Sequence, residues 1–170
     1  MVLTVDRRDR LDAAIEAMAA DSSYTAVVRR LGCLRGISTL TGFGLATEIG
    51  DWTRFTGATI GAFVGLVPTE NSSGQSRSQG SITKTGNSHA RRLLVEAAWH
   101  HAKPYRVPGK TMRDRWELAP AAARVRGHEG NRRLHQRWQG FNARKKRPAI
   151  ADVAIARELA GWAWSLAVLE

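Results

Sequence analysis

The chain has 170 residues, enough for one domain or a domain with an appendage, and its 43% hydrophobic content is sufficient for a core. Its 26 Lys and Arg outweigh its 15 Asp and Glu, so that the net charge is +11 and the isoelectric point lies near 11.1. The charge is concentrated, because residues 71–147 hold 18 basic and 4 acidic residues, a net +14. One basic region on a near-neutral scaffold favours a polyanionic partner such as nucleic acid over a plain solvated surface.

The same composition excludes several classes of protein. Cys33 is the only cysteine, so neither a disulfide within the chain nor a cysteine-rich metal site can form, which fits a reducing cytoplasm. The N-terminal residues MVLTVDRRDR lack the apolar segment of a signal peptide, and no apolar run reaches the length of a membrane span. We therefore expect a cytoplasmic protein with no membrane partner.

The N-terminal segment, residues 6–20, is predicted to be a helix. Its apolar residues fall on one stripe, with Arg and Asp on the other face. The pattern fits a simple amphipathic helix and the end of a longer coiled coil equally well. The stripe comprises Leu11, Ala14, Ile15 and Met18.

A helix, a glycine-containing turn and a second helix are predicted over residues 25–34, 35–42 and 43–49. The arrangement resembles a helix-hairpin-helix, whose turn presents backbone N–H groups to a DNA phosphate. Ser38 stands where such a turn usually has its second glycine, so a plain αα-hairpin is the equal alternative.

The rest of the chain alternates apolar helical spacing with Gly, Pro and Ser breakers, so the fold class is mostly α. We first predict a helix over 55–66 that Pro68 ends, then a loop or short twisted β-hairpin over 70–85. A helix capped by Asn87 or Ser88 is predicted to run to His101, and a weak helix interrupted by Pro120 is predicted over 111–124. A basic helix over 130–143 and a charge run over 144–147 follow, and an apolar core helix is predicted over 149–169.

The segment 70–92 carries the residues best suited to phosphodiester chemistry. Ser72, Ser73 and Gly74 form a turn of small hydroxyl residues, and serine becomes a nucleophile when a neighbour accepts its proton or a positive field stabilises the alkoxide. The residues alone do not separate this interpretation from an ordinary turn. The cations that could hold phosphate oxygens here are Arg77, Lys84, His89, Arg91 and Arg92.

A second set of cations lies further along the chain and is predicted to contact phosphates without reading sequence. Its members are Arg132, Arg133, Arg137, Lys145 and Lys146. The tryptophans among them can stack on bases, although filling the core is the more common role. These tryptophans are Trp99, Trp116 and Trp138.

No metal site is predicted from this sequence. The histidines at 100, 101, 128 and 135 lack metal-binding spacing and are expected at the surface. The acidic residues near the basic region show no paired spacing for two-metal chemistry. We therefore expect no cofactor in this chain.

Three long motifs carry a resemblance to a known family. They are RGISTLTGFGLATEIGD, FVGLVPTENSSGQSRSQGSITKTGNSHARRLLVEAAW and RRLHQRWQGFNARKKRPAIADVAIARELAGWAWSLA. Together they resemble the C-terminal transposase domain of the DEDD-type bacterial insertion-sequence transposases, the insertion-sequence one-ten family. The similarity extends over nearly the whole chain from residue 25, so we expect this domain at 25–170 and the end of a coiled coil at 1–24.

The resemblance implies DNA transposition and recombination by a serine that becomes linked to DNA, which on this sequence is Ser73, with Ser72 second. It also implies a structured guide RNA, a homo-oligomer, and a nucleoid-associated location in the bacterial cytoplasm. The family's nuclease domain, whose four acidic residues bind magnesium, is expected to precede the coiled coil, which makes this chain a truncated or separate part. The alternative function is a non-catalytic DNA- or RNA-binding remnant of a transposase.

Overall fold

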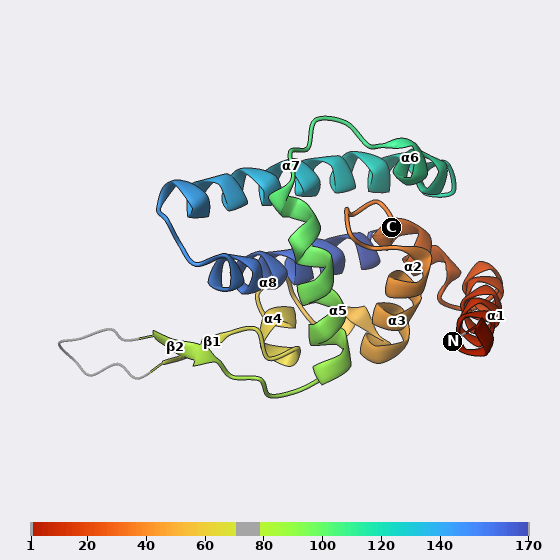
Figure 1. Ribbon diagram of the computed structural model, residues 1–170, viewed down its shortest axis with the longest axis horizontal. Coiled ribbons are helices and arrows are strands. Elements are labelled where there is room, and N and C mark those ends of the chain that lie inside the picture. The colour runs from red at the N-terminus through yellow and green to blue at the C-terminus, as the bar shows by residue number, and fades with distance from the viewer. Residues whose placement is uncertain (1, 71–78, 170) are drawn as a thin grey trace.

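The computed structural model describes residues 2–70 and 79–169, and helices dominate it (Figure 1). The prediction of a mostly α fold is confirmed. None of the described helices has the length and apolar character needed to cross a membrane. The elements are α1 (Val2–Ala20), α2 (Thr25–Leu31), α3 (Thr39–Ile49), η1 (Trp52–Arg54), α4 (Ile60–Phe63), β1 (Pro68–Glu70), β2 (Gln79–Ile82), α5 (Ser88–Ala98), η2 (Trp99–Ala102), α6 (Lys110–Glu117), α7 (Ala121–Ala143) and α8 (Pro148–Ala167).

Helix α8 is the centre of the core, as its apolar sequence predicted. It begins with Pro148, whose fixed φ and missing N–H suit the first helical position. Figure 1 shows α8 running through the middle of the molecule, with α7 along one side and α5 crossing it, and α2 and α4 also pack on it. Its fully buried residues are mainly alanines and leucines, which let several helices approach closely. They include Ile155, Ala156, Leu159, Ala160, Ala163 and Leu166.

Helix α7 is longer than predicted and begins at Ala121 rather than near residue 130. The glycines that favoured a later start lie inside the helix, where close packing requires them. A Cβ on Gly127 would overlap Cys33, and one on Gly130 would press on Trp162 and Leu34. The helical glycines therefore reflect tertiary contact between α7 and its neighbours rather than a helix boundary.

The turn between α2 and α3 is fastened to α7 by Asn131, which is fully buried. Its side-chain amide donates to the Cys33 carbonyl at 3.0 Å, and its oxygen accepts from the Arg35 N–H at 2.8 Å. The N–H groups of Cys33 and Leu34 are also bonded within the chain, to carbonyls of α2. Two helices joined by a turn are thus present, but these turn N–H groups serve the fold. A role of the turn in binding DNA remains a prediction.

The helix predicted over 55–66 is wrong in its length, since α4 covers only Ile60–Phe63. Gly65, not Pro68, marks its end, because it adopts a left-handed φ of 69°. A Cβ at Gly65 would collide with the Thr85 carbonyl, and one at Gly86 would collide with the Phe63 carbonyl. These two glycines bring the segment after α4 and the segment before α5 into contact.

Helix α1 contacts the rest of the chain through its C-terminal end. Ala19 is buried against Val28 and Ala46, while the outer apolar residues are open, with Leu3 84% and Leu11 55% exposed. The predicted stripe therefore does not cover the core of its own chain. The proposed boundary between residues 24 and 25 stays a prediction.

We predict that Asp152 makes stability fall as pH rises. Its side chain is 1% exposed, one of its oxygens has no partner among the described residues, and burial raises its pKa to about 7. Because an unfolded aspartate titrates near pH ~4, the folded state loses stability as pH rises from ~4 to about 7. Asp152→Asn should therefore raise the melting temperature by several degrees at about pH 8 and have little effect at about pH 4.

Thermal unfolding followed by circular dichroism checks this expectation. The matched control is Asp114→Asn, an exposed site that should be neutral at both pH values. An Asp152→Asn melting temperature that tracks the wild type at every pH would contradict the assignment.

Candidate nucleic-acid interface

The β1–β2 hairpin flanks the serine segment. Pro68 lies opposite Ile82 and Glu70 opposite Gln79 in an irregular antiparallel pair, which decides the sequence alternative in favour of a hairpin over a loop. The Thr69 hydroxyl donates to the Ser81 carbonyl at 3.0 Å. The predicted nucleophiles Ser72 and Ser73, together with Arg77, lie outside the described residues.

The base of the hairpin is tied to the core through Arg91. Its guanidinium donates to the carbonyls of Val64 and Thr85 at 3.0 and 3.1 Å, so it bridges the end of α4 and the segment before α5. This half-buried side chain has a structural role that its sequence position did not reveal. Lys84 and Arg92 are exposed, and Arg92 makes only a loose ion pair of 3.7 Å with Glu96.

A carboxylate that sequence reasoning missed organises the start of α5. Asn87 caps the helix by accepting from the Ala90 N–H at 2.8 Å, and its own amide donates to Glu48 Oε2 at 2.7 Å. The other Glu48 oxygen lies 2.7 Å from His89 Nδ1. These bonds lower the pKa of Glu48 and fix the His89 ring through Nδ1, with the side chain still about half exposed.

The arginines of α7 divide into paired and unpaired cations. Arg133 Nε and Arg137 Nε lie 3.2 and 2.8 Å from the two oxygens of Glu158 on α8. Arg132 is exposed, and no ion pair of its side chain occurs in the described part of the chain. Of the three predicted phosphate contacts on α7, Arg132 is therefore the one whose charge is least compensated.

The connection from α7 to α8 carries four exposed cations, residues 144–147. The guanidinium of Arg144 and the ammonium of Lys146 each lie 5.3 Å from the centre of the Phe141 ring, and Arg137 lies 5.2 Å from it. Figure 1 places this connection and the β1–β2 hairpin at the same end of the long axis, with α1 at the other end. The fold thus brings Lys145 and Lys146 of the second predicted set to the end that bears the hairpin, while the three arginines of that set lie along α7.

The burial of the tryptophans and histidines agrees only in part with the sequence prediction. Trp138 is buried in the core as predicted, whereas Trp99 contacts it in a tilted arrangement with the ring centres 5.6 Å apart and remains 45% exposed. His101 and His135 are buried rather than at the surface, and burial lowers the pKa of His101 to about 3. Within residues 2–70 and 79–169, no group of three or more His, Cys, Asp or Glu side chains is placed to hold a metal ion.

Comparison with known proteins gives consistent matches. The family model described as Transposase IS116/IS110/IS902 family matches residues 28–116, just over half of the chain. A Sinorhizobium fredii protein named "Putative transposase y4qE" is 36% identical over 161 residues, which cover 94% of this chain and 41% of that protein. The "Transposase for insertion sequence element IS1328" of Yersinia enterocolitica is 39% identical over 71 residues, 41% of this chain and 21% of its own length. The chain thus spans about two fifths of the S. fredii relative.

We predict that Glu48 stabilises the start of α5 in a pH-dependent way. Because its folded pKa is lowered, its contribution is present above the usual glutamate range and disappears as pH falls through the folded pKa. Glu48→Gln keeps the shape but removes the charge that Asn87 and His89 face. The variant should melt below the wild type at about pH 7, and the difference should shrink toward about pH 3.

The control for this experiment is Glu96→Gln, which removes an equally charged but highly exposed carboxylate. Its melting temperature should stay close to that of the wild type at both pH values, since exposed ion pairs contribute little. A Glu48→Gln variant that behaves like this control would contradict the role assigned to the network.

Proposed function

The chain belongs to the transposase IS116/IS110/IS902 family, and on this premise we propose that it serves DNA transposition as the part of a transposase that grips nucleic acid and supplies a serine nucleophile. The observation that carries the proposal is the position of the exposed cations. The run at 144–147 stands at the same end of the molecule as the hairpin flanking Ser72 and Ser73. A DNA strand held by these cations would run toward the β1–β2 hairpin, whose strands precede and follow the serine segment in the sequence.

The proposed phosphate contacts follow the pairing of the cations. Lys145, Lys146 and Arg132 are exposed and would bind phosphates directly, positioning the strand without reading its sequence. Arg133 and Arg137 share Glu158, so a phosphate there would compete with a carboxylate. Lys84 and Arg92 would hold the strand near the hairpin base. His89 would donate to a phosphate through Nε2 only as the doubly protonated imidazolium, because Glu48 accepts the hydrogen bond from Nδ1–H.

Ser73 is the proposed nucleophile, with Ser72 the second candidate. Its hydroxyl would lose its proton as Oγ attacks a DNA phosphorus. A serine–phosphate ester forms as the bridging P–O bond of the strand breaks, and the departing oxygen takes up one proton, so that the step is balanced. Support comes from the family membership and from a hairpin base anchored by Gly65, Gly86 and Arg91. Nearby cations would offset charge on the phosphate oxygens. Magnesium is expected in the family's acidic nuclease domain, not in a step assigned to this chain.

A second candidate function is a DNA- or RNA-binding module without catalysis. The observation in its favour is that the exposed cations Arg132, Lys145 and Lys146 could bind phosphates without any contribution from the serines. A structured guide RNA would bind the same cations, since phosphate contacts do not distinguish the two nucleic acids. Covalent capture of DNA separates this candidate from the nucleophile.

We predict salt-sensitive, sequence-tolerant binding to DNA or structured RNA. Each neutralised phosphate adds about 0.9 to the log–log salt slope on B-DNA, so Lys145→Gln with Lys146→Gln should lower the slope by about 2. Fluorescence anisotropy across a salt series measures this. Arg7→Gln with Arg10→Gln removes the same charge from the opposite end and should leave the slope unchanged. Equal slopes for all three proteins would refute the electrostatic assignment.

We predict that Ser73→Ala abolishes covalent capture of DNA in a complete transposition complex and leaves DNA binding near that of the wild type. One hydroxyl adds little to an interface formed by many cations, so covalent capture should be lost while the affinity for DNA stays nearly unchanged. Mass spectrometry of the trapped adduct identifies the linked residue. Ser88→Ala, an exposed serine at the start of α5, is the matched control. Full capture by the Ser72→Ala, Ser73→Ala double variant would end the serine mechanism for this chain.

We propose that the outer face of α1 pairs with a second copy, because its apolar residues are exposed and most helical stability in proteins comes from packing an apolar face. Leu3→Glu with Leu11→Glu should lower the oligomeric mass measured by light scattering. Leu118→Glu, at another exposed leucine, should not. An unchanged mass in the α1 variant would show that this face is not the contact.

A further inference from the structure

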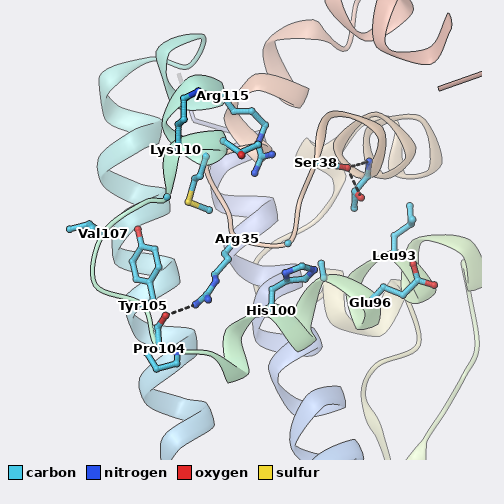
Figure 2. A pocket seen from close by; sticks show the side chains of 16 residues that line it. Arg35, Ser38, Leu93, Glu96, His100, Pro104, Tyr105, Val107, Lys110 and Arg115 are labelled. Atoms are coloured by element: carbon cyan, nitrogen blue, oxygen red, sulfur yellow. Dashed lines mark hydrogen bonds between the residues drawn. The ribbon is translucent and has the colours of Figure 1, made fainter. Parts of the chain in front are cut away.

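An open pocket of about 690 Å³ lies between the start of α3, the end of α5, the connection that follows it and α6 (Figure 2). This volume is in the range of pockets that hold small organic ligands. Figure 2 shows Ser38 on one side, Glu96 and His100 below, and Lys110 and Arg115 above, with Arg35 reaching into the middle. Segments that are far apart in the sequence thus line one space.

Neither of two partly buried arginines in this pocket has a carboxylate partner in the described part of the chain. The Nε of Arg115 is buried without a hydrogen-bond acceptor among the described residues, and burial lowers the pKa of its guanidinium. Arg35 donates to the carbonyls of Lys103 and Pro104 at 2.7 and 3.2 Å, and burial lowers its pKa as well. A buried charge without a counter-charge is costly, so an anion in this pocket would be favoured.

The rest of the lining suits an organic group attached to that anion. The two carbonyls both accept from Nη1 of Arg35, and the guanidinium carbon lies 5.8 Å from the centre of the Tyr105 ring. Guanidinium planes and aromatic rings are the surfaces on which unpaired bases stack. Leu93 and Met112 add apolar contact, and Lys110 adds an exposed cation at the rim.

We propose that this pocket binds one nucleotide of an unpaired DNA or RNA strand, with its phosphate at Lys110 and Arg115 and its base against Arg35 and Tyr105. The proposal rests on the nucleic-acid role proposed above but assigns a separate site, far from the serine segment in sequence. It requires neither Ser72 nor Ser73, so its failure and the failure of the nucleophile can be told apart.

Isothermal titration of the whole chain with adenosine 5′-monophosphate, its 2′-deoxy counterpart and inorganic phosphate tests the pocket. The nucleotides should bind more tightly than phosphate, and the tighter of the two identifies RNA or DNA as the source. Lys110→Gln should weaken nucleotide binding about fivefold, as expected for one ionic contact. Arg10→Gln removes the same charge from an exposed site on α1, outside the pocket, and should not.

Thr111→Trp provides a second variant that changes no charge. Thr111 lines the pocket and is exposed, so a tryptophan there should block the space without disturbing the core, which circular dichroism verifies. Oligonucleotides carrying 5-iodouracil or its deoxy form should crosslink to Tyr105 in the wild type and not in Thr111→Trp. Phosphate binding as tight as nucleotide binding, or equal binding by wild type, Lys110→Gln and Thr111→Trp, would overturn the proposal.

Discussion

The burial of α8 is the constraint on which the rest of the fold depends. A helix with this many apolar residues is stable in water only when it is covered on several sides, and α7, α5, α2 and α4 provide the cover. Alanines at 156, 160 and 163 keep the helix narrow, so its neighbours approach closely. The cover is reinforced by polar contacts such as Arg30, which donates to the Ala167 carbonyl at 2.7 Å.

Helix α7 has one buried face, which packs on the core, and one exposed face, which carries positive charge. One of its sides is committed to α8 and to the turn after α2, through Gly127, Asn131 and Leu134. The side that remains must be polar, and in this chain it is arginine-rich. Glu158 is less exposed than the two arginines it pairs with, so it offsets part of the charge near the core. The cations at the end of α7 have no ion pair with any residue that the structure describes.

Local patterns in the sequence were sufficient where one element determines its own structure. The apolar spacing of α8 predicted the core helix, and the alternative of Asn87 or Ser88 as the cap of α5 included the Asn87 cap that the structure contains. They failed where a distant contact decides. The glycines of α7 looked like a boundary, and the Glu48 network joins residues about forty positions apart. The pocket beside Arg35 combines three such segments, and its lining cations were indistinguishable in the sequence from any others.

The contact between α7 and the turn after α2 also gives the chain an internal reporter. Cys33 is the sole cysteine, it is fully buried beneath Gly127, and burial raises its pKa to about 12. At neutral pH almost no thiolate exists in the closed state, so an alkylating reagent reacts only after α7 separates from the turn. The rate of thiol modification therefore measures how often the centre of the molecule opens, and it does so in the native chain without an introduced label.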